Sequence, residues 1–226
     1  EKFDDKLMLW NECRVVRHGA ENHVIDTSIV GPRFYPHARK KGVCLVEICG
    51  GICTGLDAVL RAGLKVTSYS YIDKDPTARE VARGRISSMS AQYPDTFPIS
   101  AWRHAFDLPQ DVCAVDAKHL SQWAVDVTSV GASKSAVLIV AGWPCQDYSP
   151  AGHGRLGKRA AVLQDLVRII KFIQSVFKSS HNPVAYVLEN VAVQHNFRHE
   201  HLRWPVWHDL VSQLYLPITF DAVQVG

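Results

Sequence analysis

The stretch VCLVEICGGICTGL, residues 43–56, decides the fold of this chain. Its first six residues, 43–48, are apolar apart from one glutamate, which is typical of a strand buried in a parallel sheet. The glycines that follow allow the backbone to turn tightly and to approach a ligand closely. A helix is predicted next, over about 54–62, and Gly63 stands where a helix C-cap belongs. The stretch therefore predicts a strand, a glycine turn and a helix in succession.

The same alternation continues along the chain and predicts an α/β fold. Pro76 fits the first turn of a further helix, and apolar residues recur at helical spacing over 161–177. Alternating strands and helices indicate a mostly parallel, Rossmann-like sheet with helices on both faces. Residues 90–110 are expected to form a loop, residues 1–41 an irregular N-terminal segment draped over the domain, and residues 42–226 the domain itself. The predicted strands are 43–48, 66–72, 111–115, 137–141, 184–188 and 218–223, and a last helix is predicted around 205–215.

The composition excludes several classes of protein. Of the 226 residues, 47% are hydrophobic and 21% charged, and the formal net charge of +3 is compatible with nucleic-acid binding without arguing for it. No apolar run of about 18 residues is present, so no membrane span is predicted. The start at Glu1 has neither an initiator methionine nor a signal peptide and suggests a piece cut from a longer chain.

The cysteines and histidines do not indicate a metal or a disulfide framework. The six cysteines contain no CxxC pair, which favours a reduced intracellular protein over a disulfide scaffold or a structural zinc site. His195, His199 and His201 with Glu200 suggest metal ligands, because histidines at i and i+4 share a helix face. No further motif supports that site, and we expect no bound metal.

An acidic residue follows the second predicted strand and suggests a nucleoside cofactor. Asp73 stands where a carboxylate commonly bonds the ribose hydroxyls of such a cofactor. Together with the glycine turn, it predicts a cofactor site at the edge where the strand order reverses. Two simpler interpretations remain open: a plain turn for the glycines, and a helix N-terminal carboxylate for Asp73.

A thiol and a carboxyl group are expected side by side at the same edge. Cys145 follows strand 137–141, Glu189 follows strand 184–188, and one crossover helix lies between the strands, as in a right-handed βαβ unit. Such a pair suits attack on an electron-poor ring, with the thiolate adding covalently and the carboxyl sharing a proton. The alternatives are a buried small hydrophobe for Cys145 and a helix cap or surface ion pair for Glu189.

These motifs, in this order and spacing, resemble those of the cytosine-5 DNA methyltransferases. The resemblance covers roughly residues 30–226 and rests on the glycine turn, Pro144-Cys145-Gln146 and Glu189-Asn190-Val191. Gln110-Asp111-Val112 looks like the adenine-binding motif of the family. Lys118-His119, four residues ahead of Trp123, is closest to the eukaryotic de novo type. The resemblance implies a nuclear location if the source is eukaryotic.

The resemblance implies a covalent mechanism. A cytosine flipped out of duplex DNA would be attacked at carbon 6 by Cys145, while Glu189 bonds ring nitrogen 3 and the amino group. Asn190 would orient the loop that carries Cys145. S-adenosylmethionine is the implied cofactor, and oligomers with related methyltransferases are possible partners. The implied cofactor-binding residues are Glu47, Cys49, Gly50, Gly51, Thr54, Gly55, Asp73, Asp111 and Pro144, and the implied substrate-binding residues are Gln146, Ser149, Lys158 and Arg159.

The chain departs from the family pattern in three places. Cys49 stands where an aromatic residue is usual, and Tyr71 stands where the ribose-binding acid is usual, with Asp73 two residues on. An arginine motif, a recognition region and a last strand are expected after Gly226, so the catalytic domain is expected to be incomplete. The alternatives are a tRNA cytosine-5 methyltransferase, a non-catalytic regulatory relative and an inactive truncated copy.

Overall fold

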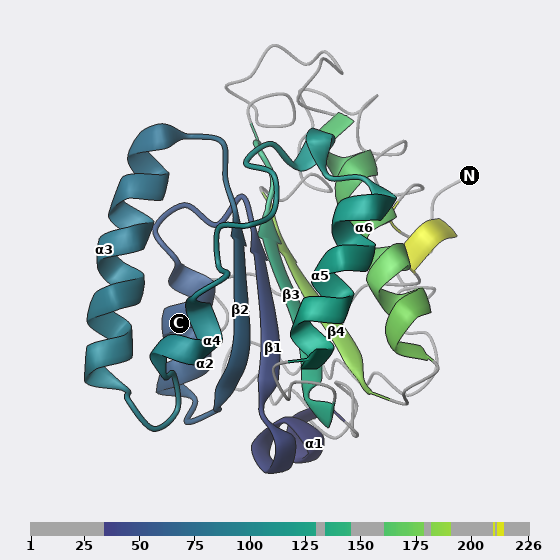
Figure 1. Ribbon diagram of the computed structural model, residues 1–226. Helices are drawn as coiled ribbons and strands as arrows, with labels where there is room; N and C mark the ends of the chain where they lie inside the picture. Colours follow the sequence, from purple (N-terminus) through teal and green to yellow (C-terminus); the bar gives the residue numbers. More distant parts are fainter. Residues whose placement is uncertain are drawn as a thin grey trace, which may run out of the picture.

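A four-stranded parallel sheet forms the centre of the molecule. The computed structural model describes residues 34–129, 134–145, 161–178, 182–190, 210 and 212–214. The strand order is β2-β1-β3-β4, and all three neighbouring pairs run parallel (Figure 1). The strands are β1 (Val43–Ile48), β2 (Val66–Ile72), β3 (Ala136–Gly142) and β4 (Val184–Glu189). The predicted α/β fold with a parallel sheet is confirmed.

Helices cover both faces of this sheet. Helices α2 (Thr54–Arg61) and α3 (Pro76–Gln92) pack on one face, in a core that contains Leu45, Leu56 and Tyr69. Helices α5 (Ala117–Ser129) and α6 (Ala161–Lys178) pack on the other face, against Val46 and Ile139 (Figure 1). Within the described part of the chain, no helix has the length and apolarity that a bilayer span requires.

The helix ends follow the predicted turn chemistry. Gly63, with φ of 71°, donates its amide to the Leu60 carbonyl just after α2, as expected for a C-terminal glycine. Pro76 is the first residue of α3, and Asp75 caps the helix by accepting from the Ala78 amide at 2.8 Å. The cap is therefore Asp75, which leaves Asp73 outside the helix.

Four predictions of local structure were wrong or incomplete. Residues 111–115 do not form a strand: Asp111 accepts from the Cys113 amide and starts a 3-10 helix, η2 (Val112–Ala114). The expected loop over 90–110 contains the end of α3 and the short helix α4 (Ile99–Trp102), which begins after Pro98. The segment 1–41, expected to be irregular, ends in helix α1 (Phe34–Lys41). Helix α5 was not predicted at all.

The C-terminal predictions are tested only in part. Residues 210 and 212–214 are helical, in agreement with a helix around 205–215. The predicted strand 218–223 lies outside the described residues.

Candidate active site at the carboxyl edge of the sheet

The glycine turn after β1 is a tight loop with three residues in the left-handed region. Cys49, Gly51 and Cys53 have φ values of 52°, 51° and 63°, a conformation that is uncommon for residues other than glycine. Gly50 has a different constraint: a Cβ there would lie 2.7 Å from Cε2 of the buried Tyr71 ring. At Gly51 a Cβ would meet nothing within 4 Å. The turn is therefore packed on one side and open on the other.

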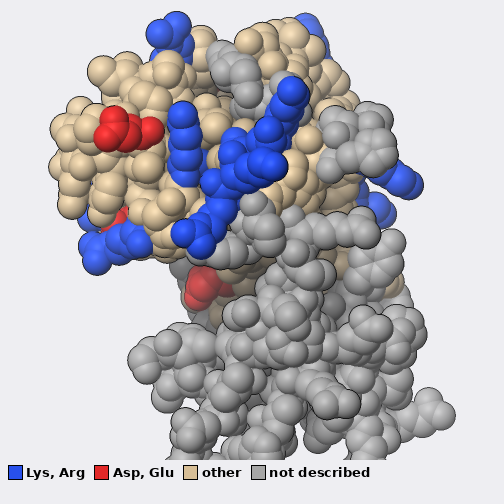
Figure 2. All heavy atoms as spheres, turned by 90° about the horizontal axis from the view of Figure 1, so that it is seen from below, with Lys and Arg blue, Asp and Glu red and all other residues tan. Residues whose placement is uncertain are grey.

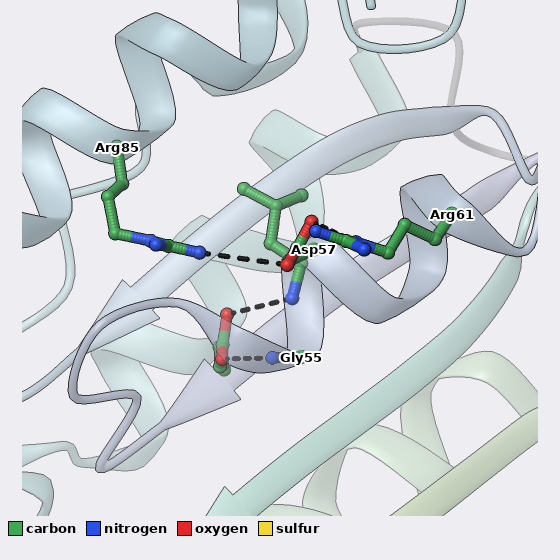
Figure 3. Close-up of polar contacts among 6 residues, drawn as sticks. Gly55, Asp57, Arg61 and Arg85 are labelled. Atoms are coloured by element: carbon green, nitrogen blue, oxygen red, sulfur yellow. Dashed lines mark hydrogen bonds and ion pairs between the residues drawn. The ribbon is translucent and has the colours of Figure 1, made fainter.

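Glu47 anchors this turn from inside the protein. Its carboxylate accepts from the Gly55 amide at 2.8 Å and from the Leu56 amide at 3.3 Å (Figure 3). It also accepts from the Tyr69 hydroxyl at 2.7 Å. The two amides belong to the first turn of α2, which receives no side-chain cap from Cys53. Glu47 therefore caps α2 from the neighbouring strand.

Glu47 is buried, and its carboxyl group is perturbed by that burial. The residue is 2% exposed, and burial raises the pKa of its carboxyl group, although the hydrogen bonds from Tyr69, Gly55 and Leu56 oppose the rise. Gly55 leaves room for it, since a Cβ there would lie 3.0 Å from Oε1. With its carboxylate bonded to internal donors, Glu47 positions the turn, and its contact with a cofactor stays a prediction.

Asp73 joins the end of β2 to the same turn. Oδ2 accepts from the Gly51 amide at 2.9 Å, and Oδ1 accepts from the Asp75 amide at 2.9 Å. Each carboxylate oxygen has a second lone pair, and the side chain is half-buried. Asp73 is thus fixed in place with acceptor capacity left for a hydroxyl group.

Three predicted cofactor residues from separate parts of the chain come together here. Burial, together with the negative charges of Asp73 and Asp111 and against the opposing charge of Lys74, raises the pKa of the Cys49 thiol to about 11. Ile48 and Ile72 pair in register at the ends of β1 and β2, so Cys49 and Asp73 follow neighbouring strands at one edge of the sheet, and the charge of Asp111 acts on the same thiol. Thr54 lies beside them as the exposed first residue of α2.

The loop that carries Cys145 and the residue Glu189 lie at the ends of adjacent strands, as the sequence predicted. Gly142, the last residue of β3, pairs in register with Glu189, the last residue of β4. A Cβ on Gly142 would lie 3.0 Å from Glu189 Oε2, so the absent side chain provides the space that the carboxylate occupies. Cys145 follows three residues later and is half-buried, as is Pro144.

Asn190 holds the loop against β4. Its side-chain Nδ2 donates to the Trp143 carbonyl at 2.9 Å, and Trp143 is 5% exposed in the core. This is the contact expected of a residue that orients the Pro144–Cys145 loop. Gly142, Tyr69 and Tyr71 are the residues at this edge that the sequence reasoning missed. A glycine that ends a run of β-branched residues was the available signal for Gly142.

The remaining predicted residues lie outside the described part. Gln146, Ser149, Lys158 and Arg159, named for substrate binding, are among them, and so are His195, His199, Glu200 and His201. Among the described residues, no group of three or more His, Cys, Asp or Glu side chains is placed to hold a metal ion.

Three thiols of β1 and of the turn after it, Cys44, Cys49 and Cys53, are expected to resist alkylation. Burial raises the pKa of Cys44 to about 12, of Cys53 to about 12 and of Cys49 to about 11. At pH 8 roughly one Cys49 molecule in a thousand carries the reactive thiolate. Treating the native protein with iodoacetamide and mapping the adducts by mass spectrometry should leave all three unmodified, and unfolding in urea should expose them. Rapid native labelling of Cys49 would contradict this account of the edge.

Residues 116–215 match the family model of the C-5 cytosine-specific DNA methylases. The family resemblance inferred from the sequence is thereby confirmed, and the match includes Cys145, Glu189 and Asn190. The closeness to the eukaryotic de novo subtype stays a prediction. A comparison with curated proteins gave no match. The matched residues include both strands of the edge formed by β3 and β4.

Proposed function

We propose that this chain transfers a methyl group from S-adenosylmethionine to carbon 5 of cytosine in DNA, with Cys145 as the nucleophile. The observation that carries the proposal is the register of β3 and β4, which places the Glu189 carboxylate against Gly142, at the root of the Cys145 loop. The Asn190 bond to the Trp143 carbonyl fixes that loop. The match to DNA methylases favours DNA over tRNA as the substrate.

The residues at the cofactor edge fit a nucleoside. Gly51 leaves the open side of the turn free of side-chain bulk, so a ligand can approach the backbone. Asp73 has acceptor capacity for ribose hydroxyls and Asp111 for an exocyclic amino group. When bound, S-adenosylmethionine supplies an electrophilic methyl group. Asp73, Asp111 and the backbone of the glycine turn would hold this cofactor.

Cys145 and Glu189 are assigned to a covalent addition to the cytosine ring. The Cys145 thiolate forms a bond to carbon 6, and the electron pair of the carbon 5–carbon 6 double bond moves to carbon 5. Glu189 shares a proton with ring nitrogen 3 and bonds the amino group, which offsets the charge that builds on the ring. Carbon 5 takes the methyl group, whose bond to the sulfonium sulfur breaks with the electron pair staying on sulfur. Carbon 5 then loses its proton to water, and the released electron pair re-forms the carbon 5–carbon 6 double bond and expels the Cys145 thiolate.

A trapped adduct tests the nucleophile. Duplex DNA that carries 5-fluorocytosine has no carbon 5 proton to lose, so the bond to Cys145 cannot break after methyl transfer. With S-adenosylmethionine present, a protein–DNA complex that survives denaturing electrophoresis is expected. Cys145→Ala should abolish this complex, whereas Cys113→Ala, which removes an exposed thiol on η2, should retain it. A complex that persists in Cys145→Ala would assign the chemistry to another residue.

A further inference from the structure

Five cationic side chains lie together at the end of the sheet opposite the candidate active site. Arg39, Lys40 and Lys41 form the last turn of α1, Lys65 immediately precedes β2, and Lys134 lies two residues before β3. All five are exposed. Figure 2 looks onto this end of the molecule and shows Lys and Arg side chains gathered across it. These five residues are called the basic face below.

Hydrogen bonds connect the three segments that carry the basic face. The His37 ring bonds the Lys134 carbonyl at 2.6 Å, and the Ser135 hydroxyl donates to the Lys41 carbonyl at 3.1 Å. The Val43 amide donates to the Lys65 carbonyl at 2.7 Å. The cations are therefore presented from backbones that are fixed relative to one another before any ligand arrives, which lowers the entropic cost of binding.

The bonds between β2 and β3 complete this arrangement. The Thr67 hydroxyl donates to Ser135 Oγ at 2.8 Å, and Gly42, with φ of 85°, packs so closely that a Cβ would lie 2.6 Å from Thr67 Cγ2. The surface thus rests on a tightly packed junction of α1, β1 and the starts of β2 and β3.

Stabilisation of α1 accounts for only part of the basic face. Cations in the last turn of a helix interact favourably with its dipole, by about 0.3–1 kcal/mol each, and this explains Arg39, Lys40 and Lys41 within α1. It does not explain Lys65 and Lys134, which belong to other elements and reach the same surface. The helix dipole therefore does not explain why cations from three separate segments lie on one surface.

Few carboxylates offset this charge. The segments 34–45, 62–68 and 134–137 contain no Asp or Glu, and among the described residues none of the five cations takes part in an ion pair. The bordering carboxylate is the exposed Asp95, whose neighbour Thr96 accepts from the Val66 amide. Within the described part of the chain, the basic face is therefore an electropositive surface.

We propose that the basic face binds the phosphate backbone of a nucleic-acid duplex, on a segment other than the one that holds the target cytosine. Lysine suits a phosphate as a point charge, and backbone contacts of this kind bind without regard to sequence. The six residues of β1 separate the two ends of the sheet by about 20 Å, so the duplex segment at the basic face is not the one seated at the candidate active site. The choice of nucleic acid as the polyanion rests on the proposed function.

The test is the salt dependence of duplex binding by the 226-residue chain. Lys65→Gln/Lys134→Gln removes two cations and leaves α1 and every backbone bond of the junction intact. Arg103→Gln/Lys171→Gln removes two exposed cations elsewhere and is the matched control. Affinity for a 30-base-pair duplex is measured by fluorescence anisotropy over a range of salt concentrations, with polyglutamate as a competing acidic peptide.

The expected result is a change in the slope of log affinity against log salt. Each lost phosphate contact reduces the slope by about 0.9, so the loss of affinity between about 50 and 200 mM salt should become about 12-fold smaller in Lys65→Gln/Lys134→Gln. An unchanged slope, or an equal change in the control, would overturn the proposal. Polyglutamate that displaces the duplex through the same two lysines would reassign the face to an acidic protein. Fluorocytosine trapping by Cys145 is unaffected by these outcomes, so the two proposals fail separately.

Discussion

Replacing Glu189 with glutamine is expected to lower the rate of methyl transfer by about 10²–10³-fold, because the transition state loses the group that shares a proton with ring nitrogen 3. Glutamine keeps the shape of the side chain, which lies against Gly142 and is otherwise exposed. The amide has no proton to share with ring nitrogen 3 in the way that a carboxyl does. Thermal unfolding should therefore be unchanged within error, and tritiated methyl transfer to duplex DNA, measured as kcat and KM, should show the loss in kcat.

A second variant separates position from chemistry at the same place. Gly142→Ala keeps the carboxyl group but places a Cβ 3.0 Å from Glu189 Oε2, so the carboxylate has to move. Because Glu189 is exposed, that movement should cost little stability and still lower kcat. If Glu189→Gln retained the full rate, the carboxyl group would have no part in the chemistry, whatever Gly142→Ala did.

Replacing Glu47 with alanine is expected to destabilise the fold by about 3–5 kcal/mol. The change leaves the Gly55 and Leu56 amides and the Tyr69 hydroxyl without their acceptor, and each buried unsatisfied group costs about 1–3 kcal/mol. Urea unfolding followed by circular dichroism measures the loss. Asp57→Ala is the control on the same helix: it removes a partly exposed carboxylate that pairs with Arg61 and Arg85 (Figure 3), and should cost less than about 1 kcal/mol.

The raised pKa of Glu47 gives this residue a characteristic pH dependence. The folded protein holds the proton more tightly than the unfolded chain, whose carboxyl group titrates near 4.5. The favourable contribution is therefore complete below that pH and is lost as the pH rises through the folded pKa. Relative to Glu47→Gln, which cannot titrate, the wild-type protein should lose stability as the pH is raised from about 4. If the difference in free energy of unfolding between the wild-type protein and Glu47→Gln stayed constant with pH, the pKa of Glu47 would be the same in the folded and unfolded chains.

The sequence predicted the strands well because their signals are local. The bounds of β1 and β2 agree with the predicted ranges 43–48 and 66–72, since buried apolar runs there are flanked by turn residues on both sides. Helix α5 carried a signal that was not used: Leu120, Trp123, Ala124 and Val127 recur at helical spacing and are all buried. The segment after Asp111 was mistaken for a strand because its valines outweighed the turn-forming side chain.

The site was predictable where it depends on topology and not where it depends on a distant partner. A single βαβ crossover predicts that the Cys145 loop and Glu189 follow neighbouring strands, and β3 and β4 are neighbours in the sheet. The role of Glu47 did not follow from the sequence, because its partner Tyr69 lies 22 residues away on another strand. Spacing within one motif gives no indication of such a bond.

The strand order has a consequence for how the protein is made. β1 occupies an interior position of the sheet, but its partner β3 does not begin until Ala136. At about 5–20 residues per second, a ribosome leaves one side of this apolar strand unpaired for roughly 5–20 s. Pairings between segments so far apart in the chain also form slowly, and a bare apolar edge invites association with other chains. We expect a chaperone to bind the nascent polypeptide after β1 has emerged from the ribosome and before β3 has.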